Sequence, residues 1–142
     1  MYFIQMQHLY LVSNDEINNF AFEMRTLVIS TSVELIRISP NNIVFISSDG
    51  NYSTLVLTDG ESRVLTLQLG QLEKLIENQL GSAGATFIRI GRSLIINRAF
   101  VYYINLPQQK LILSDQNRIN HTLNASKEAL RTLKELFEQE VK

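Results

Sequence analysis

The sequence contains no cysteine, no tryptophan and only two prolines among its 142 residues. Without cysteine there can be no disulfide framework, no thiol nucleophile and no cysteine-ligated zinc or iron–sulfur centre. No apolar run approaches the ~20 residues that a membrane-spanning helix needs. The N-terminus also lacks the basic start and the small-residue cleavage site of a signal peptide. We therefore expect a soluble, cytoplasmic protein with no membrane partner.

Groups that could support catalysis are also scarce. The two histidines, His8 and His121, lie far apart, and neither belongs to a metal-binding pattern such as HExxH or HxH. There is no phosphate-binding loop of the Walker type and no GxSxG nucleophile motif. Asp49, Asp59 and Asp115 fall in predicted turns, where a backbone role is sufficient. We predict no enzymatic activity, no catalytic residue, no metal and no cofactor.

Charge of either sign is sparse in total but unevenly distributed. The net charge of −1 argues against nucleic acid as a partner. Between Phe87 and Lys127, however, six basic residues accompany one acidic residue, a balance of +5, and the rest of the chain sums to −6. Salt screens exposed charges over about 8–10 Å, so a polyanion responds to the face that it approaches. This segment can therefore bind phosphate groups, although six ordinary solvated charges would give the same count.

The composition, 45% hydrophobic and 19% charged, suits one globular domain. Short apolar segments separated by turn residues predict a mostly β fold with minor α content. Asp-Gly dipeptides at Asp49 and Asp59 favour tight hairpins, because glycine reaches positive φ without a Cβ clash. The predicted strands cover Thr26–Thr31, Val33–Ile38, Ile43–Ser48, Ser53–Thr58, Ser62–Leu67, Phe87–Ile90, Leu94–Ile96, Phe100–Asn105, Lys110–Leu113 and Arg118–Leu123.

Two stretches follow the helical period instead. In Gln68–Leu80, apolar residues recur at three- and four-residue steps, so one face should cover a sheet. The following Gly-Ser-Ala-Gly should end this helix and form a flexible connection. A last helix should run from about Ser126 to the C-terminus, with Asn124 or Ser126 as N-cap. The predicted division is an N-terminal extension over residues 1–25, which packs on the domain or on another subunit, and a domain over residues 26–142.

The most informative segment is Phe87-Ile88-Arg89-Ile90-Gly91-Arg92-Ser93-Leu94-Ile95-Ile96-Asn97-Arg98. Its alternation predicts a strand that breaks at a Gly-Arg-Ser corner and then resumes. An arginine at such a corner can approach a partner closely, and its planar fork of donors suits phosphate oxygens or the O6/N7 edge of guanine.

Together with Ile43–Tyr52, an intervening amphipathic helix and a last helix that opens with Ser-Lys, this segment resembles the LytTR-type DNA-binding domain. The resemblance spans about Val33 to Phe137. It implies an elongated, mostly antiparallel LytTR-like β fold with one mid-chain helix and a C-terminal helix. Such domains are usually output modules of bacterial response regulators and bind promoter DNA through loops, two protomers engaging direct repeats. Met1–Arg25 is far too short for a receiver domain, so we expect a stand-alone regulator.

The resemblance also implies the DNA-binding residues. The loops that contact DNA in the family fall here at Asn51 and Tyr52, at Gly91 and Arg92, and at Ser126 and Lys127. Arg92 is expected at a base edge and Lys127 at a base or a phosphate, whereas Arg98 and Arg131 are expected at phosphates. Asn97 matches the motif but is also explained as a structural turn residue. The position of Gly91 is often histidine in the family, so one donor is missing here.

These observations predict sequence-specific binding of double-stranded DNA by a bacterial transcriptional regulator, which forms a homodimer on DNA and responds to an unidentified regulatory protein. One alternative is a protein-interaction module on the same β scaffold, favoured by the net negative charge, the missing histidine and the apolar N-terminal stretch. Another is a small-ligand-binding β domain, which is supported only by the aromatic residues Phe100, Tyr102 and Tyr103. The simpler interpretation of these aromatic residues is that they belong to the core, with Phe100 and Tyr102 on one strand face.

Overall fold

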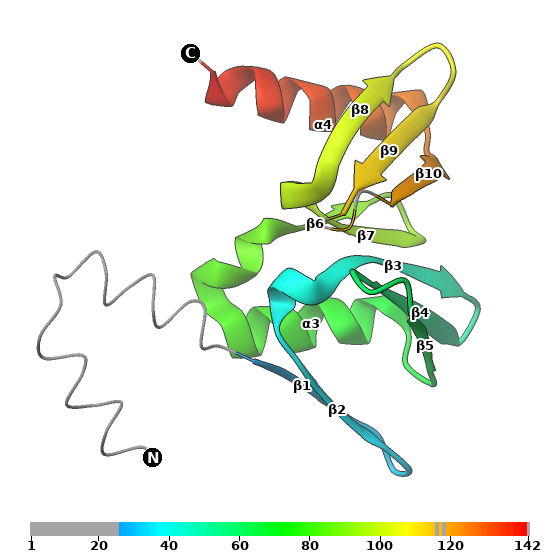
Figure 1. The fold of residues 1–142 in the computed structure, drawn as a ribbon, viewed down its shortest axis with the longest axis vertical. Helices are drawn as coiled ribbons and strands as arrows, with labels where there is room; N and C mark the ends of the chain where they lie inside the picture. Colours follow the sequence, from blue (N-terminus) through cyan, green and yellow to red (C-terminus); the bar gives the residue numbers. More distant parts are fainter. Residues whose placement is uncertain (1–25, 116, 118, 142) are drawn as a thin grey trace, which may run out of the picture.

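A computed structural model describes residues 26–115, 117 and 119–141 (Figure 1). The predicted extension, Met1–Arg25, lies outside the described residues. The elements in chain order are β1 (Leu27–Ser30), β2 (Leu35–Ile38), η1 (Pro40–Asn42), β3 (Ile43–Asp49), β4 (Tyr52–Leu57), β5 (Ser62–Leu65), α3 (Leu69–Leu80), η2 (Gly81–Thr86), β6 (Phe87–Ile90), β7 (Leu94–Asn97), η3 (Arg98–Phe100), β8 (Val101–Asn105), β9 (Lys110–Ser114), β10 (Asn120–Asn124) and α4 (Lys127–Glu140).

The strands pair antiparallel, as the sequence predicts, and they divide into three sheets. The central sheet has the order β5-β4-β3-β7-β6, a second has the order β10-β9-β8, and β1 and β2 form a separate hairpin. Figure 1 shows the central sheet between two groups of elements: α3 and the β1–β2 hairpin on one side, and the second sheet with α4 on the other. The fold is thus mostly β, with two α-helices in the described chain.

Two hydrophobic cores fill these two spaces. One joins the sheet to α3 and β1, and the other joins it to β8, β9 and α4. The central strand β3 contributes to both: Ile43 and Ile46 face the first core, whereas Val44 and Phe45 face the second. Strict alternation would not allow two neighbours on the same side, but the register of β3 shifts between Ile43 and Phe45, and such a bulge turns the next side chain to the same face.

Both helices begin where the sequence predicts. Gln68 caps α3 in a reciprocal capping box with Gln71, and Ser126 caps α4 by accepting a hydrogen bond from the Ala129 N–H at 3.1 Å. The predicted flexible connection after α3 is wrong. Residues 81–86 instead form a 3-10 helix, which begins at Gly81 with a φ of 55° and continues the backbone hydrogen bonding up to β6.

The prediction for the aromatic residues of β8 is wrong as well. Phe100 is buried but belongs to η3, and the pairing of β8 shifts between Val101 and Tyr103. This irregularity breaks the two-residue alternation, so Phe100 and Tyr102 do not share a buried face. Tyr102 is 70% exposed and Tyr103 is 41% exposed. Neither tyrosine belongs to the core.

Candidate nucleic-acid interface

Three connections lie along one edge of the molecule, at the right of Figure 1: the β3–β4 turn, the β6–β7 turn and the junction of β10 with α4. The first two are held together by a hydrogen bond from the Ser48 N–H to the Ser93 carbonyl, at 2.9 Å. The second and third face each other across a groove, which Gly91 and Ser126 both line. We call this set of three connections the edge surface. It includes six of the eight predicted site residues, and a seventh, Arg131, lies beside it one turn into α4.

The β3–β4 turn presents Asn51 and Tyr52. Gly50 adopts a φ of 65°, which a glycine tolerates without steric cost, and this conformation closes the hairpin tightly. Both predicted side chains are exposed, Tyr52 by 52%. Asn51 is not free to rotate, however, because its Oδ1 accepts a hydrogen bond from Nε2 of Gln68 at 3.2 Å. The turn is therefore tied to the first turn of α3.

The β6–β7 corner presents Arg92. Gly91 has a φ of 62°, and the position that a Cβ would take on it is open, with no atom beyond its chain neighbours within 4 Å. The backbone of this corner is held by the Arg89 side chain, which donates from Nε to the Gly91 carbonyl at 3.1 Å and from Nη2 to the Arg92 carbonyl at 2.9 Å. Arg92 itself is exposed, and its guanidinium has no partner among the described residues.

The start of α4 presents Ser126 and Lys127, with Arg131 one turn further along the helix. All three residues are exposed. Ser126 is engaged in the helix cap, whereas Lys127 and Arg131 form no ion pair with any residue that the structure describes. The N-terminal end of a helix carries partial positive charge, which adds to that of Lys127. One acidic residue, Glu128, lies in the same turn.

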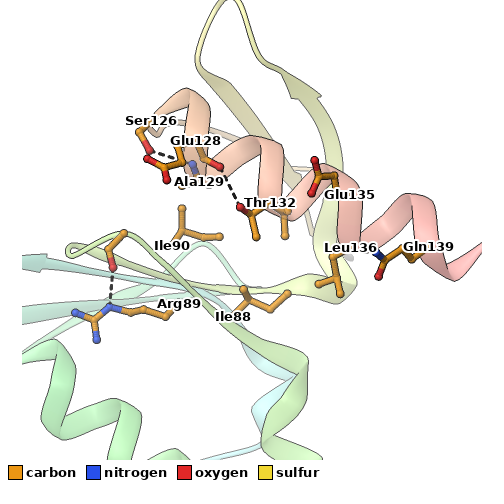
Figure 2. Close-up of a pocket in the computed structure, with 12 residues that line it drawn as sticks. Ile88, Arg89, Ile90, Ser126, Glu128, Ala129, Thr132, Glu135, Leu136 and Gln139 are labelled. Carbon is orange, nitrogen blue, oxygen red and sulfur yellow. Dashed lines mark hydrogen bonds between the residues drawn. The ribbon is translucent and has the colours of Figure 1, made fainter.

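The groove between the corner and α4 has a volume of about 570 Å³. Figure 2 shows its floor and walls, with Ile88, Ile90 and Leu136 pointing into it and Glu128 and Glu135 on its α4 side. Its lining is mixed, because the paired Arg89 and the polar residues Thr132 and Gln139 also face it, whereas the unpaired Arg92 and Lys127 do not line it. The groove separates two parts of the edge surface without itself being a site for phosphate.

Arg98 is the predicted site residue that the structure does not bring to the edge surface. It lies in η3, where it forms an ion pair with Glu140 near the end of α4, and its guanidinium stacks over the ring of Phe137 at 5.5 Å from the centroid. Only 27% of its side chain is exposed. Its charge is compensated and its fork is occupied, so the arrangement offers no support for a phosphate contact.

The basic segment thus contains cations of two kinds. Arg89 pairs with Glu73 at 3.3 Å and Arg98 pairs with Glu140. Arg92 and Lys127 are exposed and have no acidic partner in the part of the chain that the structure describes. Arg118, which the charge count includes, lies outside the described residues. Lys110, in β9, is half-buried and also forms no ion pair within the described ranges. The charge that is both exposed and unpaired at the edge surface comes from Arg92, Lys127 and the neighbouring Arg131.

The buried polar residues near this segment have structural roles. Asn97 is almost fully buried, accepts hydrogen bonds from Ala99 and Thr86, and donates to the carbonyl of Ile43 at 3.0 Å, so it is a turn residue of the fold. Asp115 likewise closes the turn after β9 by accepting from two backbone N–H groups, from Asn117 and Ile119. This confirms the predicted backbone role of Asp115.

His121 contacts the same carboxylate, with Nε2 at 3.2 Å from Oδ2 of Asp115. Burial alone would raise the pKa of Asp115, but the hydrogen bonds from Ile119, His121 and Asn117 together hold it below the usual value. No group of three potential metal ligands occurs within the described ranges. His8 lies outside them.

The role of Arg89 could not be predicted from the sequence, which suggests a free cation at this position and places Glu73 on the solvent side of α3. The two side chains meet because β6 passes beside α3, a contact between residues 16 apart that no local pattern contains. The one local signal is the short distance along the chain: Arg89 lies two residues before Gly91 and three before Arg92.

A family model for the LytTr DNA-binding domain matches residues 33–138. The chain belongs to the LytTR family. This confirms the predicted family, and the LytTR domain accounts for most of the described fold. No curated protein matches the sequence. No described helix is long and apolar enough to cross a membrane.

The structure is also similar to the LytTr DNA-binding domain of a methyl-accepting/DNA response regulator from Bacillus cereus. The two chains share 16% sequence identity with a TM-score of 0.54, and the match covers 80% of this chain and 96% of the other. At this identity the likeness concerns the fold, and it confirms the predicted LytTR-like β architecture.

Proposed function

We propose that this LytTR domain binds double-stranded DNA in a sequence-specific way and regulates transcription in the bacterial cytoplasm, where the promoters lie. The observation that carries the proposal is the edge surface. It collects three turns on one side of the molecule and leaves Arg92 and Lys127 exposed and without an acidic partner in the described chain. Because the chain belongs to a family of DNA-binding domains, DNA is the expected ligand.

The turns would read DNA without an inserted recognition helix. Arg92 projects from a narrow corner and carries the bidentate fork that matches O6 and N7 of guanine in the major groove. Lys127, at the start of α4, would meet a base or a phosphate. Arg131, which lies further along the helix, would meet phosphates that set the register without reading sequence. Asn51, Tyr52, Gly91 and Ser126 would complete the contact surface. We leave Arg98 out, because Glu140 and Phe137 already occupy its guanidinium.

Two copies would occupy the two halves of a direct repeat, so that each copy buries one edge surface. A homodimer on DNA and contact with a regulatory protein are part of the proposal. Neither depends on the unpaired cations, and each would need its own measurement, such as sedimentation of the protein with and without DNA.

The proposal is tested by selecting binding sites from random duplex DNA, followed by a titration of the selected duplex at several salt concentrations. We expect an enriched motif in two copies at a fixed spacing. The affinity should fall steeply with salt, because each neutralised phosphate releases counterions. No binding at low salt, or no enriched sequence, would contradict the proposal and favour the protein-interaction module. A partner captured equally by the wild type and by the Arg92→Ala/Lys127→Ala variant would support that second function.

A further inference from the structure

We infer that Arg89 is a positioning residue, which fixes the Gly91–Arg92 corner in its DNA-binding conformation and is itself held in place by Glu73 of α3. The inference deepens the proposed function and rests on it, because the corner matters only if it meets DNA. It assigns to Arg89 a task different from those of Arg92 and Lys127: the donors of Arg89 face the protein, and the side chain that they orient is that of Arg92.

All three nitrogens of the Arg89 guanidinium are engaged. Nε donates to the Gly91 carbonyl at 3.1 Å, Nη2 donates to the Arg92 carbonyl at 2.9 Å, and Nη1 donates to Oε1 of Glu73 at 3.3 Å. Figure 2 shows the side chain running from β6 towards the corner. Its charge is compensated by Glu73 and only 29% of its side chain is exposed. To contact a phosphate with its fork, Arg89 would have to release the corner.

The peptide groups of Gly91 and Arg92 lie between two other anchors, the Ile90–Leu94 strand pair and the hydrogen bond from the Ser48 N–H to the Ser93 carbonyl. The Arg89 side chain holds the two carbonyls that lie between these anchors. Gly91 adopts a positive φ, and no atom lies within 4 Å of the position that a Cβ would take there. A glycine in an open turn loses much conformational entropy when it is ordered. Two hydrogen bonds from a rigid, planar fork to successive carbonyls fix the orientation of both peptide groups. They thereby fix the direction in which Arg92 leaves the backbone, before any DNA arrives.

A parallel contact shows that α3 holds a second turn in the same way. Gln68, the N-cap of α3, donates from Nε2 to Oδ1 of Asn51 in the β3–β4 turn at 3.2 Å. Glu73, in the second turn of the same helix, holds Arg89 and through it the β6–β7 corner. One rigid element thus fixes the spacing of two turns of the edge surface, which is what a protein needs if it reads two neighbouring positions of a duplex with turns.

The experiment compares Arg89→Lys with a matched control, Arg63→Lys. Lysine keeps the charge but cannot bond to two carbonyls and a carboxylate in one plane. Arg63 also pairs with a glutamate, Glu61, at 3.1 Å, but it lies beside the β4–β5 turn, at the opposite end of its hairpin from the edge surface. Glu73→Gln serves as a second variant, because it loosens Arg89 without substituting a residue of β6 or of the corner. Three quantities are measured: affinity for the selected duplex, its salt dependence, and amide exchange at Gly91 and Arg92 in the free protein.

We expect Arg89→Lys to weaken DNA binding about 10-fold, the equivalent of one or two net hydrogen bonds, and Glu73→Gln to weaken it less. Amide exchange at the corner should accelerate in both variants. The slope of log K against log [salt] should stay unchanged, because Arg89 neutralises no phosphate. Arg63→Lys should change none of the three quantities.

Unchanged affinity and unchanged corner exchange in Arg89→Lys would overturn the inference. It would also be overturned if Arg89→Ala lowered the salt slope by about 0.9, the effect expected when one phosphate is no longer neutralised. If the wild type bound no DNA, the proposed function would fail. The exchange measurement in the free protein would then still decide whether Arg89 holds the corner.

Discussion

Cations near the two halves of α4 differ in whether an acidic residue compensates them. In the C-terminal half, Lys134 pairs with Glu138 at 3.1 Å and Arg98 of η3 pairs with Glu140. At the N-terminal end, Lys127 is exposed and has no acidic partner among the described residues. Cations that are compensated within the fold attract a polyanion weakly, whereas unpaired ones attract it strongly. The pairing of each cation, more than the number of cations in the segment, thus distinguishes the surface that we propose for DNA.

The largest expected effect is a loss of stability, caused by a substitution in the core that anchors α4. Leu130 is fully buried in the core between α4 and the sheets. Leu130→Ala should lower the free energy of unfolding by about 2–5 kcal/mol, because it leaves a cavity. Urea denaturation measures this change. The matched variant Leu136→Ala, at a partly buried position of the same helix, should cost less. Equal losses in the two variants would show that α4 is not anchored as described.

A single substitution at the edge surface should affect binding and leave stability intact. Arg92→Ala should cost about 1–3 kcal/mol of binding free energy and relax the preference at one base pair. Fluorescence polarisation with the selected duplex and its single-base variants measures both effects, and thermal unfolding serves as the stability control. A uniform loss over all sequences would instead assign Arg92 to a phosphate and contradict its role at a base.

The cap of α4 allows stability and binding to be separated at one position. Ser126→Ala removes the hydrogen bond to the Ala129 N–H and should cost about 1 kcal/mol of unfolding free energy. Ser126→Asp should keep the cap and the stability, because aspartate is an equally good N-cap, yet its charge should weaken DNA binding. Chemical denaturation and DNA titration of the two variants provide the measurement. Undiminished DNA binding by Ser126→Asp would place this end of α4 outside the interface.

The buried Asp115–His121 pair should give the smallest of these effects, and that effect depends on pH. The pKa of Asp115 is lower in the folded protein than in the unfolded chain. Its contribution to stability is therefore complete above the pKa of the unfolded carboxyl and is lost as the pH falls through the lower, folded value. Unfolding of the wild type and of Asp115→Asn across the acid range measures this. The difference between the two proteins should shrink as the pH falls, and a difference that grows would contradict the account.

The sequence predicts much of the fold because its signals are local. Asp-Gly turns, alternation within strands and the serine before α4 each depend on a few neighbouring residues, and the strands and both helices occur where predicted. The alternation fails in β8, where a bulge exposes Tyr102, because the bulge depends on the partner strand. The pairing of Arg89 with Glu73 and of Arg98 with Glu140 depends on tertiary contacts in the same way. Local patterns can therefore identify a basic segment but cannot separate its paired cations from its free ones.

In the proposed function, the unpaired cations of the edge surface bind duplex DNA. The most direct test compares two double variants with the same change in charge, Arg92→Ala/Lys127→Ala and Arg98→Ala/Lys134→Ala, in salt titrations with the selected duplex. The account predicts that the first variant binds DNA far more weakly than the wild type and that its salt slope falls by up to about 1.8, or 0.9 for each phosphate that is no longer neutralised. The second variant should bind like the wild type. Equally weakened binding in both variants, or weakened binding in the second alone, would contradict the claim.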